Sequence, residues 1–142
     1  MFNLTDPQHH LAVAHADHAL EIALVADRQP QFDLGLLPGE VLVIKGQGVR
    51  LPHVGWNELS LTAADPLFQG LSTTPEFYFD HSYTVACDPG MVTSVVSYHG
   101  TQFPASIWRG NVFGIQCHPE KGHRSGLAYI KNFVRFSMDT HG

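Results

Sequence analysis

Two residues near the end of the chain have the types and spacing of a catalytic base and the carboxylate that orients it. His118 and Glu120 flank Pro119 in the stretch GIQCHPEKG. A carboxylate bonded to one imidazole nitrogen fixes the tautomer and stabilises the imidazolium, which leaves the other nitrogen to accept a proton from a nucleophile. The preceding run, NVFGIQCH, is predicted to be a buried strand, and alternate residues of a strand face the same side. A surface His-Pro-Glu turn without chemistry is the alternative.

Neither cysteine of the chain is predicted to be the nucleophile that such a pair would serve. Cys117 precedes His118 on the same predicted strand, and neighbouring side chains face opposite sides, so a core cysteine is expected there. Cys87 stands in YTVACDPG, between an apolar run and a turn, without the sharp glycine-flanked elbow that exposes a catalytic nucleophile. The residues thus offer a base and a carboxylate but no recognisable thiol for them.

The ten histidines raise the question of a metal site. His15 and His18 are spaced to share one face of a helix, and His9 and His10 lie near them in the sequence. No H-E-x-x-H motif and no cysteine pair at zinc spacing accompanies them, so no metal is expected. Partly exposed helix histidines are the simpler interpretation, and a His-rich metal-binding domain is a distant alternative.

The composition is that of one folded domain. The chain has 142 residues, of which 44% are hydrophobic and 15% charged. A formal charge of −5 without a basic stripe argues against a nucleic-acid partner. The start lacks a secretory signal, and no apolar run approaches the roughly 18 residues of a membrane span. We expect a cytoplasmic protein with free thiols and no cofactor.

Hydrophobic patterning divides the chain into two unlike parts. Residues 1–32 are rich in alanine and histidine and are predicted to form one helix, with Asp6 as its N-cap. After these residues, short β-prone runs alternate with glycine and proline turns, which predicts strands, several of them joined as hairpins. Gly100 and Gly110 are expected to take positive φ in two of the turns. The last segment, RSGLAYIKNFVRFSMD, has its apolar residues at helical spacing and is predicted to close the sheet.

Three stretches in this order resemble the second half of a class I, triad-type glutamine amidotransferase: LPHVGWNEL, FYFDHSY and GNVFGIQCHPEKG, the last followed by SGLAYIKNF. The HPE run fits many amidotransferases. The upstream P-H-x-G-W-N and the lysine directly after the glutamate make the glutaminase subunits of imidazole glycerol phosphate synthase the most similar group. The resemblance covers about residues 33–136. It implies an α/β fold, the C-terminal part of a flavodoxin-like three-layer domain, so residues 33–142 are expected to be a partial amidotransferase domain and residues 1–32 an atypical helical segment.

The resemblance also implies an activity and a set of site residues. This group hydrolyses glutamine with a Cys-His-Glu triad and passes the ammonia to a (β/α)₈-barrel cyclase subunit in histidine biosynthesis. By this resemblance, His118 is the triad base and Glu120 its carboxylate. The segment that lines the glutamine pocket is matched by His81, Ser82 and Tyr83. The positions on the cyclase-facing side are matched by Trp56, Asn57 and Lys121. A tryptophan beside a turn is otherwise a packing residue or an interface anchor.

The first 32 residues depart from the family. They contain no cysteine, no Gly-x-Cys-x-Gly elbow and no oxyanion loop. The chain therefore looks truncated, as a frameshift or a misplaced start would leave it, and it is expected to be inactive alone. The alternative is a non-catalytic remnant that still binds the cyclase. Without the parallel strands of the other half, the sheet of residues 33–120 is expected to have an uncovered edge.

Overall fold

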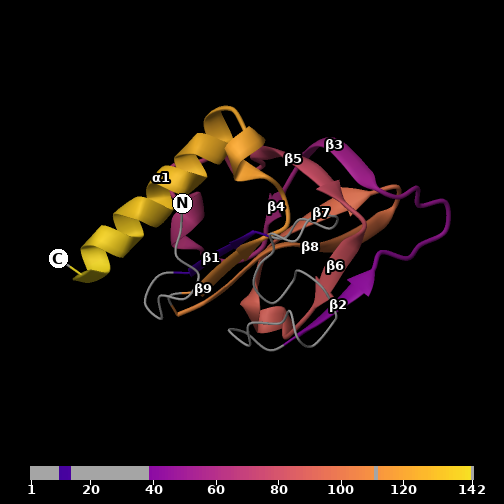
Figure 1. The fold of residues 1–142 in the computed structure, drawn as a ribbon, viewed down its shortest axis with the longest axis horizontal. Coiled ribbons are helices and arrows are strands. Elements are labelled where there is room, and N and C mark those ends of the chain that lie inside the picture. Colours follow the sequence, from indigo (N-terminus) through magenta and orange to yellow (C-terminus); the bar gives the residue numbers. More distant parts are fainter. Residues whose placement is uncertain (1–9, 14–38, 111, 142) are drawn as a thin grey trace.

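The computed structural model describes residues 10–13, 39–110 and 112–141, which form a β-rich body closed by one long helix (Figure 1). The strands are β1 (His10–Val13), β2 (Glu40–Val43), β3 (His53–Glu58), β4 (Ser60–Leu61), β5 (Glu76–His81), β6 (Tyr83–Ala86), β7 (Val92–Tyr98), β8 (Thr101–Arg109) and β9 (Val112–Ile115). The helical elements of this described part are the 3-10 helices η3 (Pro66–Phe68), η4 (Pro89–Met91) and η5 (Pro119–Lys121), and α1 (Arg124–His141).

The largest sheet has the strand order β1-β9-β8-β7-β4. Its strands β9, β8, β7 and β4 pair antiparallel, whereas β1 runs parallel to β9. Two further pairs, β2 with β6 and β3 with β5, form antiparallel ribbons. The β-rich middle and the closing helix predicted from the sequence are therefore confirmed.

The two predicted glycine turns join the strands of the large sheet. His99 and Gly100, between β7 and β8, have φ of 48° and 77°. Positive φ at both central residues is the geometry of a type I′ turn, whose twist matches that of the flanking strands. Gly110, between β8 and β9, has φ of 63°. Both glycines thus take the backbone conformation that the sequence predicts.

Aromatic rings connect α1 to the large sheet and to β5. The ring of Phe113 on β9 lies edge-on to Phe133 and Phe136, with centroids 6.1 Å and 5.1 Å apart. Tyr129, which is fully buried, packs against Phe77 of β5 at 6.1 Å. All of these rings except Phe136, which packs against the others, belong to a single core cluster, so α1 is held by the same core as the strands. No helix in the described part of the chain is long and apolar enough to cross a membrane.

The N-terminal segment differs from its prediction. The helix predicted for residues 1–32 is wrong at residues 10–13, which form β1 and pair with Val112–Ile115. Main-chain pairing with an available strand edge outweighs local helix propensity here, because tertiary context decides such weak preferences. The sequence predicts an uncovered edge without saying which one; in the structure β1 lies beside β9, and β4 is the strand at the other end of the sheet. The rest of the predicted helix, with its boundary at residue 32, lies outside the described residues.

A close contact between η5 and the first turn of α1 fixes the His-Pro-Glu segment. Gly126 is buried, and a Cβ there would collide with the carbonyl oxygen of Pro119. A Cβ on Gly122 would lie 2.9 Å from the Cα of Gly126. Gly122 also donates its N–H to Pro119 O at 3.0 Å. Both glycines are required by the close approach of two backbones, so they set the position of η5 on α1.

We predict that Gly126→Ala lowers the free energy of unfolding by about 1–3 kcal/mol, because the added methyl must push η5 away from α1. Urea denaturation measures this. Gly90→Ala is the matched control, since Gly90 is exposed and its added Cβ would meet nothing closer than Asp88 Oδ1 at 3.4 Å. Equal stability losses for the two variants would contradict the prediction.

Candidate active site

His118 is held at the end of the large sheet by a main-chain bond to β5. Its N–H donates to Tyr78 O at 2.9 Å, and its side chain is buried. It stands at the N-cap position of η5, with extended φ and ψ of −104° and 91°. The main chain of His118 is thus held on one side by β5 and on the other by η5, and this determines where its imidazole lies.

The structure brings His118 and Glu120 together, as predicted, but through a turn rather than a strand. His118 Nδ1 lies 3.3 Å from Glu120 Oε1. The predicted continuous strand is wrong here, since β9 ends at Ile115 and Pro119 begins η5. Proline cannot donate to a strand ladder and suits the first position of a helix, which explains the change of element. The Glu120 side chain is half exposed, whereas that of His118 is buried.

Both thiols lie in environments that disfavour a thiolate. Cys117 is fully buried in the core cluster, as predicted, and burial raises the pKa of its thiol well above the ordinary value. Cys87 is partly buried, and burial together with neighbouring Asp88 raises the pKa of its thiol as well. Because the thiolate is the reactive form, neither cysteine has the surroundings of an activated nucleophile.

A chain of hydrogen bonds through two buried histidines lies beneath the ribbon of β3 and β5. His81 Nδ1 lies 2.8 Å from Tyr83 O, and His81 Nε2 lies 2.8 Å from His53 Nδ1. His53 Nε2 lies 2.7 Å from Asn57 Oδ1. Both imidazoles have no exposed surface. Every ring nitrogen of this pair is therefore engaged by protein. His81 belongs to the interior, and the partly buried Asn57 contacts His53 instead of facing outward with Trp56.

Burial sets the protonation of the two rings. Desolvation lowers the pKa of His81 to about 3, and the charges of His53 and His118 act in the same direction. Desolvation also lowers the pKa of His53, with a further contribution from His99 on the β7–β8 turn and an opposing one from the bond to Asn57. Both histidines are neutral at pH 7, because a buried imidazolium without a carboxylate partner is costly.

The outer face of the same ribbon carries an aromatic cluster of Trp56, Tyr78, Lys121 and His123. The register places Trp56 opposite Tyr78, with ring centroids 5.5 Å apart. His123 stacks on Trp56 at 4.9 Å and an interplanar angle of 7°. Lys121 Nζ lies 5.3 Å from the centre of the Tyr78 ring, within the range of a cation–π contact. The structure therefore joins the predicted residues Trp56 and Lys121, while Asn57 faces the other side.

Tyr78 and His123 are members of this cluster that sequence reasoning missed. Tyr78 also lies 6.2 Å from the His118 ring, so it borders both the base and the outer cluster. The alternation of FYFDHSY contains the signal for Tyr78, because every second residue of a strand faces outward. His123 has no comparable signal, since its contact with Trp56 depends on the path of the chain after η5.

The remaining predicted pocket residues, Ser82 and Tyr83, lie where β5 passes into β6. Both are partly exposed, and Ser82 O accepts the Ile44 N–H at 3.0 Å. Their assignment to a glutamine pocket stays a prediction. No group of three or more His, Cys, Asp or Glu side chains able to hold a metal occurs among the described residues, and the side chains of His9, His10, His15 and His18 lie outside that description.

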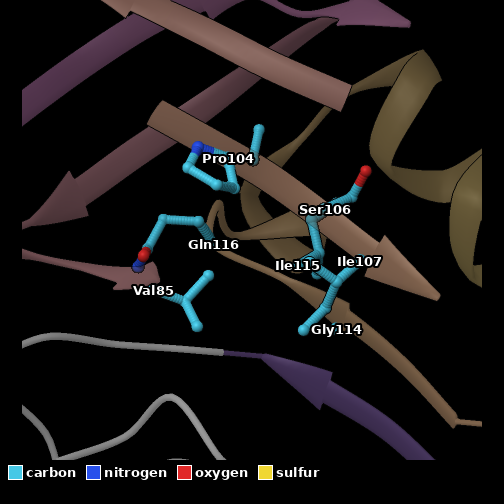
Figure 2. A pocket seen from close by; sticks show the side chains of 8 residues that line it. Val85, Pro104, Ser106, Ile107, Gly114, Ile115 and Gln116 are labelled. Atoms are coloured by element: carbon cyan, nitrogen blue, oxygen red, sulfur yellow. The ribbon is translucent and has the colours of Figure 1, made fainter. Parts of the chain in front are cut away.

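A small cavity lies between β8, β9 and β6 (Figure 2), and neither His118 nor Glu120 lines it. Its volume is ≈ 10 Å³, about what a single water needs. Its lining is mostly apolar and consists of Val85, Pro104, Ala105, Ser106, Ile107, Gly114, Ile115 and Gln116. Nothing in its size or its mostly apolar lining indicates a site for glutamine.

A histidine in contact with a carboxylate is the arrangement that the base of a triad-type hydrolytic site requires, and the catalytic roles of His118 and Glu120 stay a prediction. The chain belongs to the family described as glutamine amidotransferase class-I, which matches residues 35–136. Among curated relatives, the imidazole glycerol phosphate synthase subunit HisH of Nitrosomonas europaea is 37% identical over 73% of this chain and 53% of its own length. The HisH of Moorella thermoacetica is 43% identical over 70% of this chain and 47% of its own.

Two further comparisons extend this result. The HisH of Pyrococcus furiosus is 40% identical over 72% of this chain and 52% of its own length, so the chain spans about half the length of the curated relatives it matches. A crystal structure of a putative GMP synthase subunit from Thermoplasma acidophilum aligns with a TM-score of 0.58 and 17% identity. That alignment covers 72% of this chain and 50% of the other, and it shows a shared fold.

We predict that the buried histidines make this fold sensitive to acid. Their folded pKa values are lowered, so below the unfolded value of 6.5 the unfolded chain binds more protons than the native one. The free energy of unfolding therefore falls as pH drops below 6.5, by up to about 1.4 kcal/mol per pH unit for each histidine. Urea denaturation between pH 7 and pH 5 measures the slope.

The double variant His53→Gln/His81→Gln is the control for this slope. Asp65, whose pKa is raised by burial, is present in both proteins, so its opposite contribution cancels in the comparison. The double variant is expected to lose less stability between pH 7 and pH 5 than the original chain. An identical pH slope in the two proteins would show that the histidines do not carry the effect.

Proposed function

We propose that this chain carries the base, the orienting carboxylate and the partner-binding face of a glutaminase subunit of imidazole glycerol phosphate synthase. The observation that carries the proposal is the 3.3 Å contact between His118 Nδ1 and Glu120 Oε1 inside the segment matched by the amidotransferase family. The HisH names of the relatives support this particular subunit over other amidotransferases.

In the proposed reaction, each member of the pair has a step. Glu120, whose Oε1 lies 3.3 Å from His118 Nδ1, would accept a hydrogen bond from Nδ1–H during the reaction and so fix the tautomer with a lone pair at Nε2. Nε2 then takes the proton of a thiol that attacks the carboxamide carbon of glutamine, and returns it to the leaving nitrogen as ammonia departs. Water subsequently releases glutamate from the acyl-enzyme. The half-exposed Glu120 can stabilise the imidazolium without being fully desolvated.

The attacking thiolate is the missing part of this sequence of steps. Cys117 is enclosed in the core, and both thiols have a raised pKa. These observations favour the second candidate function, a non-catalytic remnant that binds the cyclase without hydrolysing glutamine. Both functions share the partner, a (β/α)₈-barrel cyclase subunit, and differ only in glutamine chemistry.

The aromatic cluster is the surface that we assign to the cyclase. Trp56 is 40% exposed although it is large and apolar, and neighbouring Val54 on the same face is 50% exposed. Tryptophan and tyrosine dominate the energetics of protein interfaces, and Lys121 adds a charge at the rim. Tyr78, a member of the cluster, lies 6.2 Å from the His118 ring, so the cluster lies beside the base, where ammonia would leave.

We predict that the chain alone has no measurable glutaminase activity. Loss of a triad nucleophile lowers kcat by about 10⁶ in the protease in which it was measured. Glutamate release at saturating glutamine measures the rate, with His118→Ala as the background control. Release above that background which disappears in Cys87→Ser or Cys117→Ser would identify a working thiol and contradict the prediction.

We predict that Trp56→Ala weakens binding of the purified cyclase subunit by about 30-fold or more, the loss of about 2 kcal/mol typical of an interface anchor. Calorimetric titration measures the affinity. Val134→Ala is the control, because Val134 is 45% exposed but lies on α1. Equal affinities of both variants would exclude the aromatic cluster as the docking face, and no binding by the original chain would exclude both candidate functions.

A further inference from the structure

We infer that His53 and His81 form a neutral two-imidazole relay that starts at the carbonyl of Tyr83, ends on the amide group of Asn57, and holds residues 81–83 in place. The relay consists of four consecutive groups joined by three contacts of 2.7–2.8 Å. In this relay, His81 and Asn57 position the backbone of residues 81–83 and do not contact a substrate or a partner directly. Its link to a glutamine pocket rests on the proposed function, whereas the relay itself does not.

The carbonyl of Tyr83 fixes the direction of every bond in the relay. A carbonyl oxygen only accepts, so His81 Nδ1 must carry a hydrogen and donate it. A neutral His81 then has a lone pair at Nε2, which accepts from His53 Nδ1–H. Both rings are therefore in the Nδ1–H tautomer, and His53 Nε2 is left with a lone pair that faces Asn57.

The orientation of the Asn57 amide is coupled to the charge of His53. With Oδ1 toward Nε2, at 2.7 Å, the two rings must together carry one additional proton, on His53 or on His81; with Nδ2 toward Nε2, both rings are neutral. His53 is stacked between the rings of Phe79 at 4.7 Å and Tyr98 at 4.0 Å. Burial lowers the pKa of both rings, and His99 acts in the same direction on His53, as His118 does on His81. The neutral relay thus has Asn57 Nδ2 donating to His53.

The relay holds the bend between β5 and β6. His81 ends β5 and bonds back to Tyr83, the first residue of β6, so it spans Ser82. Ser82 O is fixed independently by the Ile44 N–H at 3.0 Å. His53 and Asn57 of β3 hold the imidazole of His81 in place. That imidazole in turn holds the backbone at Tyr83, so β3 side chains help to position the bend between β5 and β6.

Nitrogen-15 NMR of the full chain with labelled histidine tests the tautomers. At pH 7, His53 and His81 are each expected to show a protonated Nδ1 and an unprotonated Nε2. A proton on Nε2 of either ring at pH 7 would overturn the relay. This measurement needs no variant, so it does not depend on whether a mutant folds.

Asn57→Asp tests the coupling to the amide. A carboxylate only accepts, so His53 is expected to become doubly protonated at pH 7, while His81 keeps its single proton on Nδ1. Gln47→Glu, at an exposed position, controls for the added charge and is expected to leave both rings unchanged. A singly protonated His53 in the folded Asn57→Asp variant would contradict the inference.

Two substitutions of His81 separate positioning from packing. The amide nitrogen of asparagine can replace the Nδ1–H donor, so His81→Asn is expected to keep amide-exchange protection at Tyr83 within about threefold of the original chain. His81→Leu fills the space without a donor. Its amide-exchange protection at Tyr83 is expected to fall about tenfold, which corresponds to the loss of roughly one buried hydrogen bond. Equal protection in the two variants would show that His81 only packs. Glutamine titration of the chain with the cyclase tests the proposed function separately.

Discussion

The hydrogen bond from His118 N–H to Tyr78 O is the contact on which the candidate site depends. It joins the His-Pro-Glu segment, which follows β9, to β5, which belongs to a different sheet. Without it, the imidazole would be placed only by its own turn, and the carboxylate contact would have no fixed relation to the β3–β5 ribbon. The close packing of η5 on α1 acts at the other side of the same segment, so the base is held between a strand and a helix.

The period-two geometry of β5 gives its faces separate roles. Phe77, Phe79 and His81 point inward, where the first two fill the core and the third completes a hydrogen-bonded chain. Tyr78 points outward and meets Trp56 and Lys121. A shift of one residue in the register of β3 against β5 would exchange these faces, burying the tryptophan and exposing the histidine. The register in which His53 lies opposite His81 therefore maintains both the buried hydrogen-bonded histidines and the outward-facing aromatic cluster.

The sequence allows the strands, the two glycine turns and the closing helix to be predicted, because these follow local rules: alternation, positive φ at glycine and helical spacing. It also identifies His118 and Glu120, since their spacing is short. It does not reveal the bonds from His81 to His53 or from His118 to Tyr78, because both join residues on separate strands and depend on register. Asn57 and Trp56 are neighbours in a motif, yet the pleat sends them to opposite faces. The N-terminal prediction is wrong at residues 10–13, where a distant strand edge outweighs an alanine-rich composition.

The pairing of β1 with β9 also determines the order in which the molecule can assemble. His10 lies opposite Val112, so this ladder forms only when residues about a hundred positions apart in the sequence meet. In contrast, tight turns join β7 to β8 and β8 to β9. Closing a long loop costs more entropy than closing a hairpin, and contacts between distant residues slow folding. The antiparallel strands can therefore form as a unit first and leave the outer edge of β9 open for a time. During that interval any other extended segment, including the β1 segment of a second molecule, competes for the edge that β1 finally occupies.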